Sequence, residues 1–277
     1  MTIFLQTIPS DENGKYDQPK WQTEDSIIGI SPGLGLRPKQ SKERIDSAII
    51  MFNKDSTLSD EKDMKQPKVE PWQDWVTRID SFLDVYRNAT IDGKGKVCKE
   101  GDGAESKTAC QFNLDVLKDC GKKGSYGYDK GSPCVFLKLN KIYGLVNEQY
   151  NDQLPEDMPQ DLKTHINAQA NKNQVWVHCQ GKYPADKEML KGGINYFPSS
   201  QGFPNYYCPY KGQSDYVSPL VAVQFTPNQK AIGQMVHVEC RAWAPNIGYS
   251  RRDKIGISVF EIQILNGAIA KELNEAE

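Results

Sequence analysis

The chain has 277 residues, which is long enough for one large domain or two smaller ones with a substantial core. Its 34 basic and 36 acidic residues leave a formal charge of −2, and this near balance excludes the strongly basic surface of a nucleic-acid-binding protein. No stretch approaches the roughly 20 consecutive apolar residues that span a bilayer.

The first 70 residues predict an extended segment. Residues 1–8 are apolar for only a few positions and lack the basic flank and cleavage site of a signal peptide. Two interpretations remain open, namely the last turn of a transmembrane helix that is otherwise missing, or a frayed terminus. Residues 9–70 are polar and rich in Gly and Pro, which predicts a stalk with loops. Within this stalk Gly33-Leu34-Gly35 predicts a turn, and residues 41–52 fit a short helix that places Ile45, Ala48, Ile49 and Phe52 on one face.

A longer helix is predicted over residues 72–86, with Pro71 in the position that proline favours at a helix start. Its apolar side chains recur at helical spacing: Trp72, Trp75, Val76, Ile79, Phe82, Leu83 and Tyr86. A tryptophan platform for carbohydrate or a partner is one interpretation of this stripe, and a core-facing surface is the favoured one. The sequon Asn88-Ala89-Thr90 follows, so Asn88 is a candidate glycosylation site.

Seven cysteines point to disulfides: Cys98, Cys110, Cys120, Cys134, Cys179, Cys208 and Cys240. Zinc is the competing interpretation, but the chain has no Cys-x-x-Cys pair, which zinc sites favour. Together with the sequon, the cysteines favour an extracellular or lumenal compartment.

Beyond residue 134 the pattern has a period of two, which is typical of strands. We expect strands over residues 134–139, 175–179, 220–225, 235–244 and 256–264, and a helix around Leu162 and Ile166. Alternation places Cys179 with Val177 on the apolar face of one strand, and Cys240 with Val238 on the apolar face of another. This arrangement is similar to the inter-sheet bridge of an immunoglobulin-like sandwich, and such a bridge would contribute about 4 kcal/mol. The 72–86 helix is expected to pack across one sheet.

Candidates for chemistry are few. His178 and His237 are expected on the polar faces of their strands, where a metal pair is conceivable but two solvated side chains are favoured; His165 is the third histidine. The chain contains none of the familiar nucleophile, zinc-protease or phosphate-loop motifs. We therefore predict no catalytic residue, no metal ligand and no cofactor.

Four blocks of sequence resemble one family. They are Pro32-Gly33-Leu34-Gly35-Leu36-Arg37-Pro38, the run from Tyr126 through Pro133-Cys134 to Tyr143-Gly144, Ser218-Pro219-Leu220-Val221-Ala222-Val223-Gln224-Phe225, and Glu239-Cys240-Arg241-Ala242-Trp243 to Ile247. The chain resembles the ectodomain of Na,K-ATPase β-subunits, particularly invertebrate, nervana-like forms. The resemblance covers residues 19–264.

The resemblance implies particular site residues. The family's bridges map onto Cys98–Cys110, Cys120–Cys134 and Cys179–Cys240, the last in agreement with the strand faces. Cys208 is left over, either buried and inert or pairing between chains. Tyr206, Tyr207, Tyr210 and Gly212 are the expected contacts with the catalytic α-subunit.

The resemblance also implies fold, partner and location. The expected fold is a mainly β, immunoglobulin-like antiparallel sandwich with one packed amphipathic helix, long loops and three disulfides. The expected divisions are residues 1–8 (end of a membrane helix), 9–70 (stalk), 71–264 (extracellular domain) and 265–277 (tail).

The implied function is non-catalytic: assisting the folding, membrane delivery and potassium affinity of the α-subunit. The protein would be a single-pass type II protein of the plasma membrane, held there by a helix that this chain lacks. A small FXYD-type subunit and adhesion partners are further implied partners. Two alternatives are a pump-independent adhesion glycoprotein and a β-subunit of an H,K-ATPase.

Overall fold

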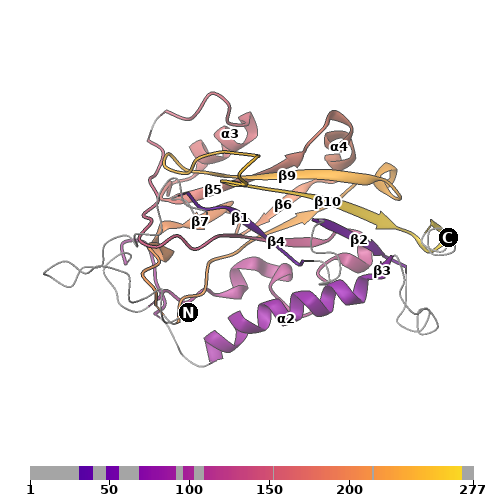
Figure 1. The fold of residues 1–277 in the computed structure, drawn as a ribbon, viewed down its shortest axis with the longest axis horizontal. Coiled ribbons are helices and arrows are strands. Elements are labelled where there is room, and N and C mark those ends of the chain that lie inside the picture. Colours follow the sequence, from indigo (N-terminus) through magenta and orange to yellow (C-terminus); the bar gives the residue numbers. More distant parts are fainter. Residues whose placement is uncertain are drawn as a thin grey trace, which may run out of the picture.

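The computed structural model describes residues 31–39, 48–55, 69–91, 96–102, 109–151, 153–213 and 215–269, with the backbone alone for 89–91. These residues build two β-sheets with helices on both outer sides, and strand outweighs helix (Figure 1). The expected strands and both expected helices beyond residue 70 are present, with bounds that differ by a few residues.

The smaller sheet has four antiparallel strands in the order β1-β4-β8-β6. Their bounds are Leu34–Arg37 for β1, Cys134–Leu139 for β4, Val221–Phe225 for β8 and Ile194–Phe197 for β6. Strand β4 is almost wholly buried because β1 and β8 flank its edges, a helix covers one face, where Phe82 meets Phe136, and the core between the sheets covers the other.

The larger sheet has six strands in the order β3-β2-β10-β9-β5-β7. Their bounds are Glu70–Pro71, Ile49–Asn53, Ile257–Leu265, Met235–Trp243, Gln174–Gly181 and Gly202–Pro204, respectively. Strand β2 runs parallel to β10 and to β3, and the other pairs are antiparallel. The core lies between the two sheets, where Phe225 of β8 meets Phe260 of β10 with ring centroids 5.8 Å apart.

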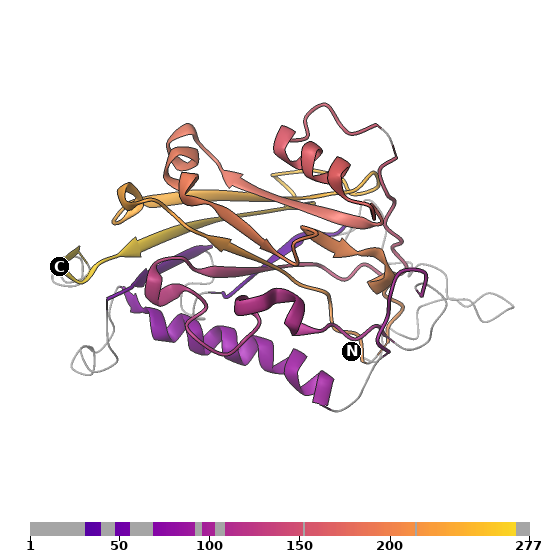
Figure 2. The same cartoon turned by 180° about the vertical axis from the view of Figure 1, so that it is seen from behind.

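Helix α2 (Trp72–Ile91) lies along one side of the molecule beneath the sheets (Figures 1 and 2). Trp75, Ile79 and Leu83 are fully buried at successive helical turns, and the Trp75 indole donates a hydrogen bond to the Met51 carbonyl at 3.0 Å. The tryptophan stripe is therefore core, as the favoured interpretation held.

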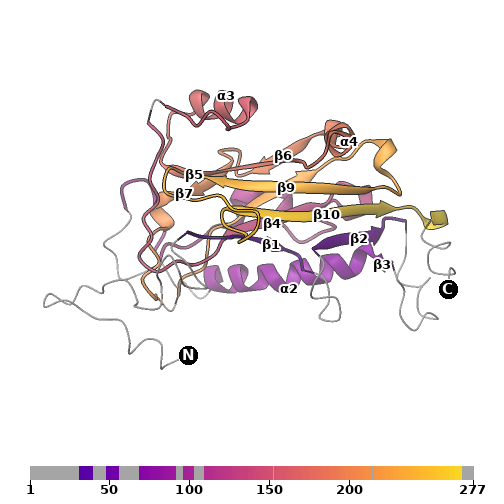
Figure 3. The ribbon, with the colours of Figure 1, turned by 45° about the horizontal axis from the view of Figure 1, so that its top comes forward.

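Helices α3 (Gln160–Ala168) and α4 (Pro184–Met189) cover the opposite side, over the larger sheet (Figure 3). Leu162 and Ile166 of α3 form a second small core with Trp176 and Trp243, a directly opposed pair on β5 and β9. Short 3-10 turns complete the described fold at Leu114–Cys120, Tyr128–Lys130, Leu190–Gly192, Asn205–Tyr207 and Gln229–Ala231.

Two local predictions in the stalk were wrong. Residues 49–53 form strand β2 rather than the end of a helix, because parallel pairing with β10 satisfies their backbone; residues 41–47 lie outside the described part. Gly33-Leu34-Gly35 is not a turn, because Leu34 and Gly35 pair with β4. The spacing of apolar residues at 49–52 fits either a helix or a strand, and pairing with distant strands decides between the two.

The prediction of a disulfide between the two sheets was also wrong. Cys179 and Cys240 lie directly opposite each other on β5 and β9, so their disulfide joins neighbouring strands of the larger sheet. The alternation of side chains along each strand correctly predicted that both cysteines face the core. It does not reveal to which sheet each strand belongs. The immunoglobulin-like bridge is therefore replaced by a cross-strand disulfide in a two-sheet α/β fold.

Candidate functional site

The expected contact residues belong to a larger cluster of tyrosines. We call this cluster the tyrosine site and define it as Lys141, Tyr143, Tyr206, Tyr207, Tyr210 and Tyr216. Its segments come from the loop after β4 and from the run after β7, and a short parallel bridge pairs Tyr143 with Tyr210. The Gly144 amide donates to the Tyr210 carbonyl at 2.8 Å and fixes that pairing.

In one half of the tyrosine site, aromatic rings surround the ammonium group of Lys141. The Tyr210 ring centroid lies 6.3 Å from that of Tyr143 and 5.0 Å from that of Tyr216. The Lys141 ammonium lies 5.0 Å from the centroids of both Tyr210 and Tyr216, and it donates to the Tyr216 carbonyl at 3.2 Å. Partial burial lowers the pKa of Lys141. The negative faces of the two rings hold the ammonium in place.

The other half is an aromatic anchor. Tyr207 is buried, its ring lies 5.8 Å from Phe112, and Phe112 in turn meets Tyr86 of α2. Burial raises the pKa of Tyr207 far above its ordinary value, so this phenol stays protonated. Tyr206 is half-buried and rests on Tyr207 with centroids 4.6 Å apart. The three expected tyrosines are close in sequence, but they have different roles. Tyr207 is an internal support for Tyr206, whereas Tyr210 rests on Tyr143; Tyr206 and Tyr210 are partly exposed.

Gly212 lies at the edge of the tyrosine site. It is exposed and has a φ of +81°, and a methyl group at this position would meet the Tyr143 ring at 3.8 Å. A positive φ favours glycine because a side chain would strain the backbone. Gly212 therefore shapes the chain after Tyr210 and leaves the surface there open.

The structure contains three disulfides: Cys98–Cys110, Cys120–Cys134 and Cys179–Cys240. The sulfur of Cys110 lies 3.1 Å from the Tyr206 carbonyl oxygen, so the first bridge holds its segment against the tyrosine site. The second ties a 3-10 turn to the first residue of β4. In sequence, these two bridges fall in the segment that joins α2 to β4, and they cross-link it.

Cys208 is the free cysteine among the described residues. Its sulfur accepts a hydrogen bond from the Asn147 amide at 3.0 Å, and burial raises the pKa of its thiol to about 11. The two residues line a cavity of about 30 Å³ that Tyr210 and Tyr216 also border. A thiol with so high a pKa is a poor nucleophile at neutral pH.

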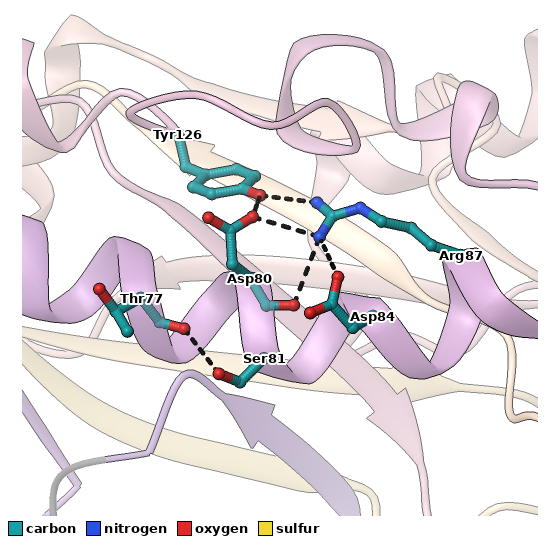
Figure 4. Close-up of polar contacts among 6 residues, drawn as sticks. All are labelled: Thr77, Asp80, Ser81, Asp84, Arg87 and Tyr126. Atoms are coloured by element: carbon teal, nitrogen blue, oxygen red, sulfur yellow. Dashed lines mark hydrogen bonds and ion pairs between the residues drawn. The ribbon is translucent and has the colours of Figure 1, made fainter.

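Asn88 lies exposed in the last turns of α2, which a polar network attaches to the rest of the fold (Figure 4). The Tyr126 hydroxyl donates to the Asp80 carboxylate at 2.5 Å. The Arg87 guanidinium donates to the Tyr126 hydroxyl at 2.8 Å and to Asp84 at 2.9 Å, and it lies 3.2 Å from Asp80. One residue before the sequon, the helix is therefore anchored to the turn that precedes β4.

The histidines do not form a metal pair. His178 is buried beneath α3, where its Nε2 lies 2.9 Å from the Asp161 carboxylate, so the interpretation of a solvated side chain was wrong for it. His237 is half-buried, and its ring lies 3.4 Å from Asp186 and 3.7 Å from Glu261. Within the described ranges, no group of three His, Cys, Asp or Glu side chains is arranged to hold a metal ion.

Sequence reasoning missed three members of the tyrosine site: Lys141, Tyr143 and Tyr216. Lys141 and Tyr143 stand in the block after Cys134 that carried the family resemblance, and Tyr216 precedes the block that begins at Ser218. For Lys141 and Tyr143 the position in that block was the available signal, but only the folded chain shows that all three residues meet Tyr210.

Two sheets, three disulfides and a partly exposed group of tyrosines define a disulfide-stabilised two-sheet domain. Comparison with known proteins identifies the family. The profile described as sodium/potassium ATPase β chain matches residues 1–260, so the chain belongs to this family and is a non-catalytic subunit of an ion pump.

Named relatives agree with this assignment. The sodium/potassium-transporting ATPase subunit beta-1 of Drosophila melanogaster is 44% identical over 249 residues, which cover 88% of this chain and 74% of the relative. The beta-2 subunit of the same organism is 38% identical over 258 residues (89% and 75%), and that of Mus musculus is 33% identical over 285 residues (95% and 79%). Among the described helices, none is both long enough and apolar enough to cross a bilayer.

Proposed function

We propose that this chain associates with the catalytic α-subunit of a Na,K-ATPase through the tyrosine site. The observation that carries the proposal is the pair Tyr206 and Tyr210, which are partly exposed and rest on the buried Tyr207 and on Tyr143. Tyrosines are enriched at the centres of protein interfaces because they bury a large surface with little loss of side-chain entropy. Gly212 beside them leaves room for a partner to approach.

The association would act on the pump by linkage. A partner that binds only the folded α-subunit stabilises it, which favours its folding and its delivery to the membrane. A partner that binds one pump conformation more tightly than another shifts the balance between them, and with it the potassium affinity. Neither effect requires a residue of this chain to touch an ion.

We further propose the topology of a single-pass type II protein of the plasma membrane, with the described domain outside the cell. Three disulfides and the sequon at exposed Asn88 support an oxidising compartment with glycosylation. The predicted end of a membrane helix at residues 1–8 lies outside the described residues. A small FXYD-type subunit would be a further partner within the pump.

Glycosylation of Asn88 has its own test. Expressed in a eukaryotic cell, the protein should lose the mass of one glycan on treatment with an amidase that removes N-glycans, and Asn88→Gln should abolish that shift. An unchanged mass in the unmutated protein would contradict the glycosylation proposal and leave the α-subunit proposal standing.

The association is tested by co-expression with a Na,K-ATPase α-subunit in cells that lack their own β-subunit, with the amino-terminal segment of the fly beta-1 relative placed before residue 1. We expect detergent-stable co-purification and cardiac-glycoside-sensitive ATPase activity that depend on this chain. Tyr206→Ala with Tyr210→Ala should weaken both, whereas Tyr183→Ala, an exposed tyrosine beside α4, should not. Tyr207 is left intact because it is buried.

Three other outcomes are informative. Co-purification of the double variant at the unmutated level would refute the tyrosine contact. Surface expression without any α-subunit binding would refute the pump proposal and favour a pump-independent adhesion glycoprotein. Pairing with an H,K-ATPase α-subunit in preference to the sodium pump would correct the identity of the partner.

A further inference from the structure

Four basic side chains gather beside the tyrosine site. We call them the basic edge and define it as Arg37, Lys39, Lys138 and Lys141. Strand β1, which carries Arg37, is an edge strand of the smaller sheet, and β4, which carries Lys138, is its neighbour. Gly35 pairs with Lys138 and Arg37 pairs with Phe136, so Arg37 and Lys138 are diagonal neighbours on one sheet face.

Within the part of the chain that the structure describes, the basic edge has none of the carboxylate partners that accompany other cations. Arg78 is paired with Glu70, Arg241 with Asp157, and Arg87 with two aspartates. By contrast, no described carboxylate lies within ion-pair distance of any of the four members of the basic edge. Burial lowers the pKa of Lys138, and the charges of Arg37, Lys141 and Lys39 lower it further. Among the described residues, these like charges thus repel one another with no carboxylate in ion-pair distance to offset them.

Protection of a sheet edge does not account for this arrangement. Lysines on edge strands do prevent edge-to-edge pairing between chains. However, the β4 residue Lys138 belongs to an inner strand and packs its stem against Gly35, 3.4 Å from where a β-carbon would lie. Lys141 lies beyond the strand, over the rings of Tyr210 and Tyr216. A surface of fixed positive charge that is continuous with a binding site is instead suited to an acidic partner.

We propose that the basic edge binds an acidic segment of the extracellular loops of the α-subunit, next to the tyrosine contact. The inference rests on the proposed function, since Lys141 belongs to both surfaces and makes them one continuous interface. Carboxylates of the partner would relieve the repulsion within the basic edge. Such contacts chiefly speed and orient association, and salt screens them.

The test uses the co-expression system described above with the double variant Lys39→Glu/Lys138→Glu, which leaves every member of the tyrosine site unchanged. We expect co-purification to fall by about tenfold or more at low ionic strength and to approach the unmutated level as salt is raised. Lys138→Met keeps the packing of the stem and removes its charge, so its effect should be intermediate. The matched control is Lys122→Glu, because the Lys122 side chain is 71% exposed and forms an ion pair with exposed Asp119.

The two variants together distinguish the acidic-partner proposal from the tyrosine-contact proposal. If Tyr206→Ala/Tyr210→Ala weakens assembly and the charge-reversed variant does not, the acidic partner is refuted and the tyrosine contact stands. If neither variant weakens assembly, both proposals fail. A loss that is the same at all salt concentrations would indicate misfolding rather than lost charge and would overturn the inference.

A second measurement on the same variant distinguishes a protein partner from a lipid partner. Binding to phosphatidylcholine vesicles with and without phosphatidylserine is compared for the unmutated and charge-reversed proteins. Loss of binding to the anionic vesicles, with normal α-subunit assembly, would assign the basic edge to lipid headgroups and refute the protein partner.

Discussion

The turn at Gly127 should be one of the most sensitive points of the fold. Gly127 has a φ of +78°, and its carbonyl accepts hydrogen bonds from the amides of Ser132 at 2.8 Å and Lys130 at 3.2 Å. A β-carbon placed on Gly127 would overlap the Ser132 carbonyl oxygen, and backbone cannot swing aside as a flexible side chain can. Gly127→Ala therefore combines an unfavourable backbone conformation with a steric clash.

The magnitude follows from the two contributions. A left-handed backbone costs an alanine about 1–2 kcal/mol, and forcing extra volume into a packed region costs typically about 1–3 kcal/mol. We expect the free energy of unfolding to fall by about 3 kcal/mol. For a domain of this size, that lowers the midpoint of thermal unfolding by roughly 6–12 °C.

Two other glycines separate the contributions. Gly144 has a φ of +71° with no atom within 4 Å of the added β-carbon, so Gly144→Ala should show the backbone contribution alone, about 1–2 kcal/mol. Gly124 has neither a positive φ nor a close neighbour, so Gly124→Ala should be neutral or slightly stabilising. Thermal unfolding followed by circular dichroism, with disulfides intact, measures all three. Equal shifts for Gly127→Ala and Gly144→Ala would refute the clash.

Three further predictions concern named groups. Burial and the hydrogen bond to Asp80 raise the pKa of Tyr126 to about 12, above its unfolded value near 10, so its contribution to stability is complete below pH 10 and is lost as the pH rises through 12. Urea unfolding between pH 9 and 12 should therefore show a shallower loss of stability for Tyr126→Phe, and parallel curves would contradict this account. Cys208 should react slowly with a thiol reagent in the native protein at pH 8 and rapidly after denaturation; rapid native labelling would contradict the raised pKa of its thiol. Replacing Cys179 and Cys240 together by alanine should lower the free energy of unfolding by about 4 kcal/mol, because the disulfide closes a loop with a sequence separation of 61. Urea titration measures this loss. A loss below about 1 kcal/mol would show that loop closure is not the main effect of the disulfide.

Local periodicity determined much of this protein from sequence alone. The apolar stripe of α2 and the alternation in β5, β8, β9 and β10 depend on neighbours within a few residues, so they can be read without the fold. The turning of Cys179 and Cys240 toward the core follows from the same alternation. The family, and with it the non-catalytic role, follows from blocks of sequence that the comparisons support.

Long-range pairing determined the rest. Residues 34–37 and 49–53 become strands only because β4 and β10 offer them partners far along the chain. Cys179 and Cys240 share one sheet because β5 and β9 are neighbours, which no strand face reveals. His178 is buried because α3 folds back over β5, and its own strand gives no sign of that cover.

The proposed contact surface depends on tertiary structure in the same way. Tyr206, Tyr207 and Tyr210 are alike in sequence, yet packing against Phe112 makes Tyr207 a support and leaves the other two partly exposed. Lys141, which lies far from Tyr210 in the sequence, meets its ring in the fold. The sequence specifies which side chains are present. The burial and the electrostatic environment of each side chain depend on neighbours that are brought together only when the chain folds.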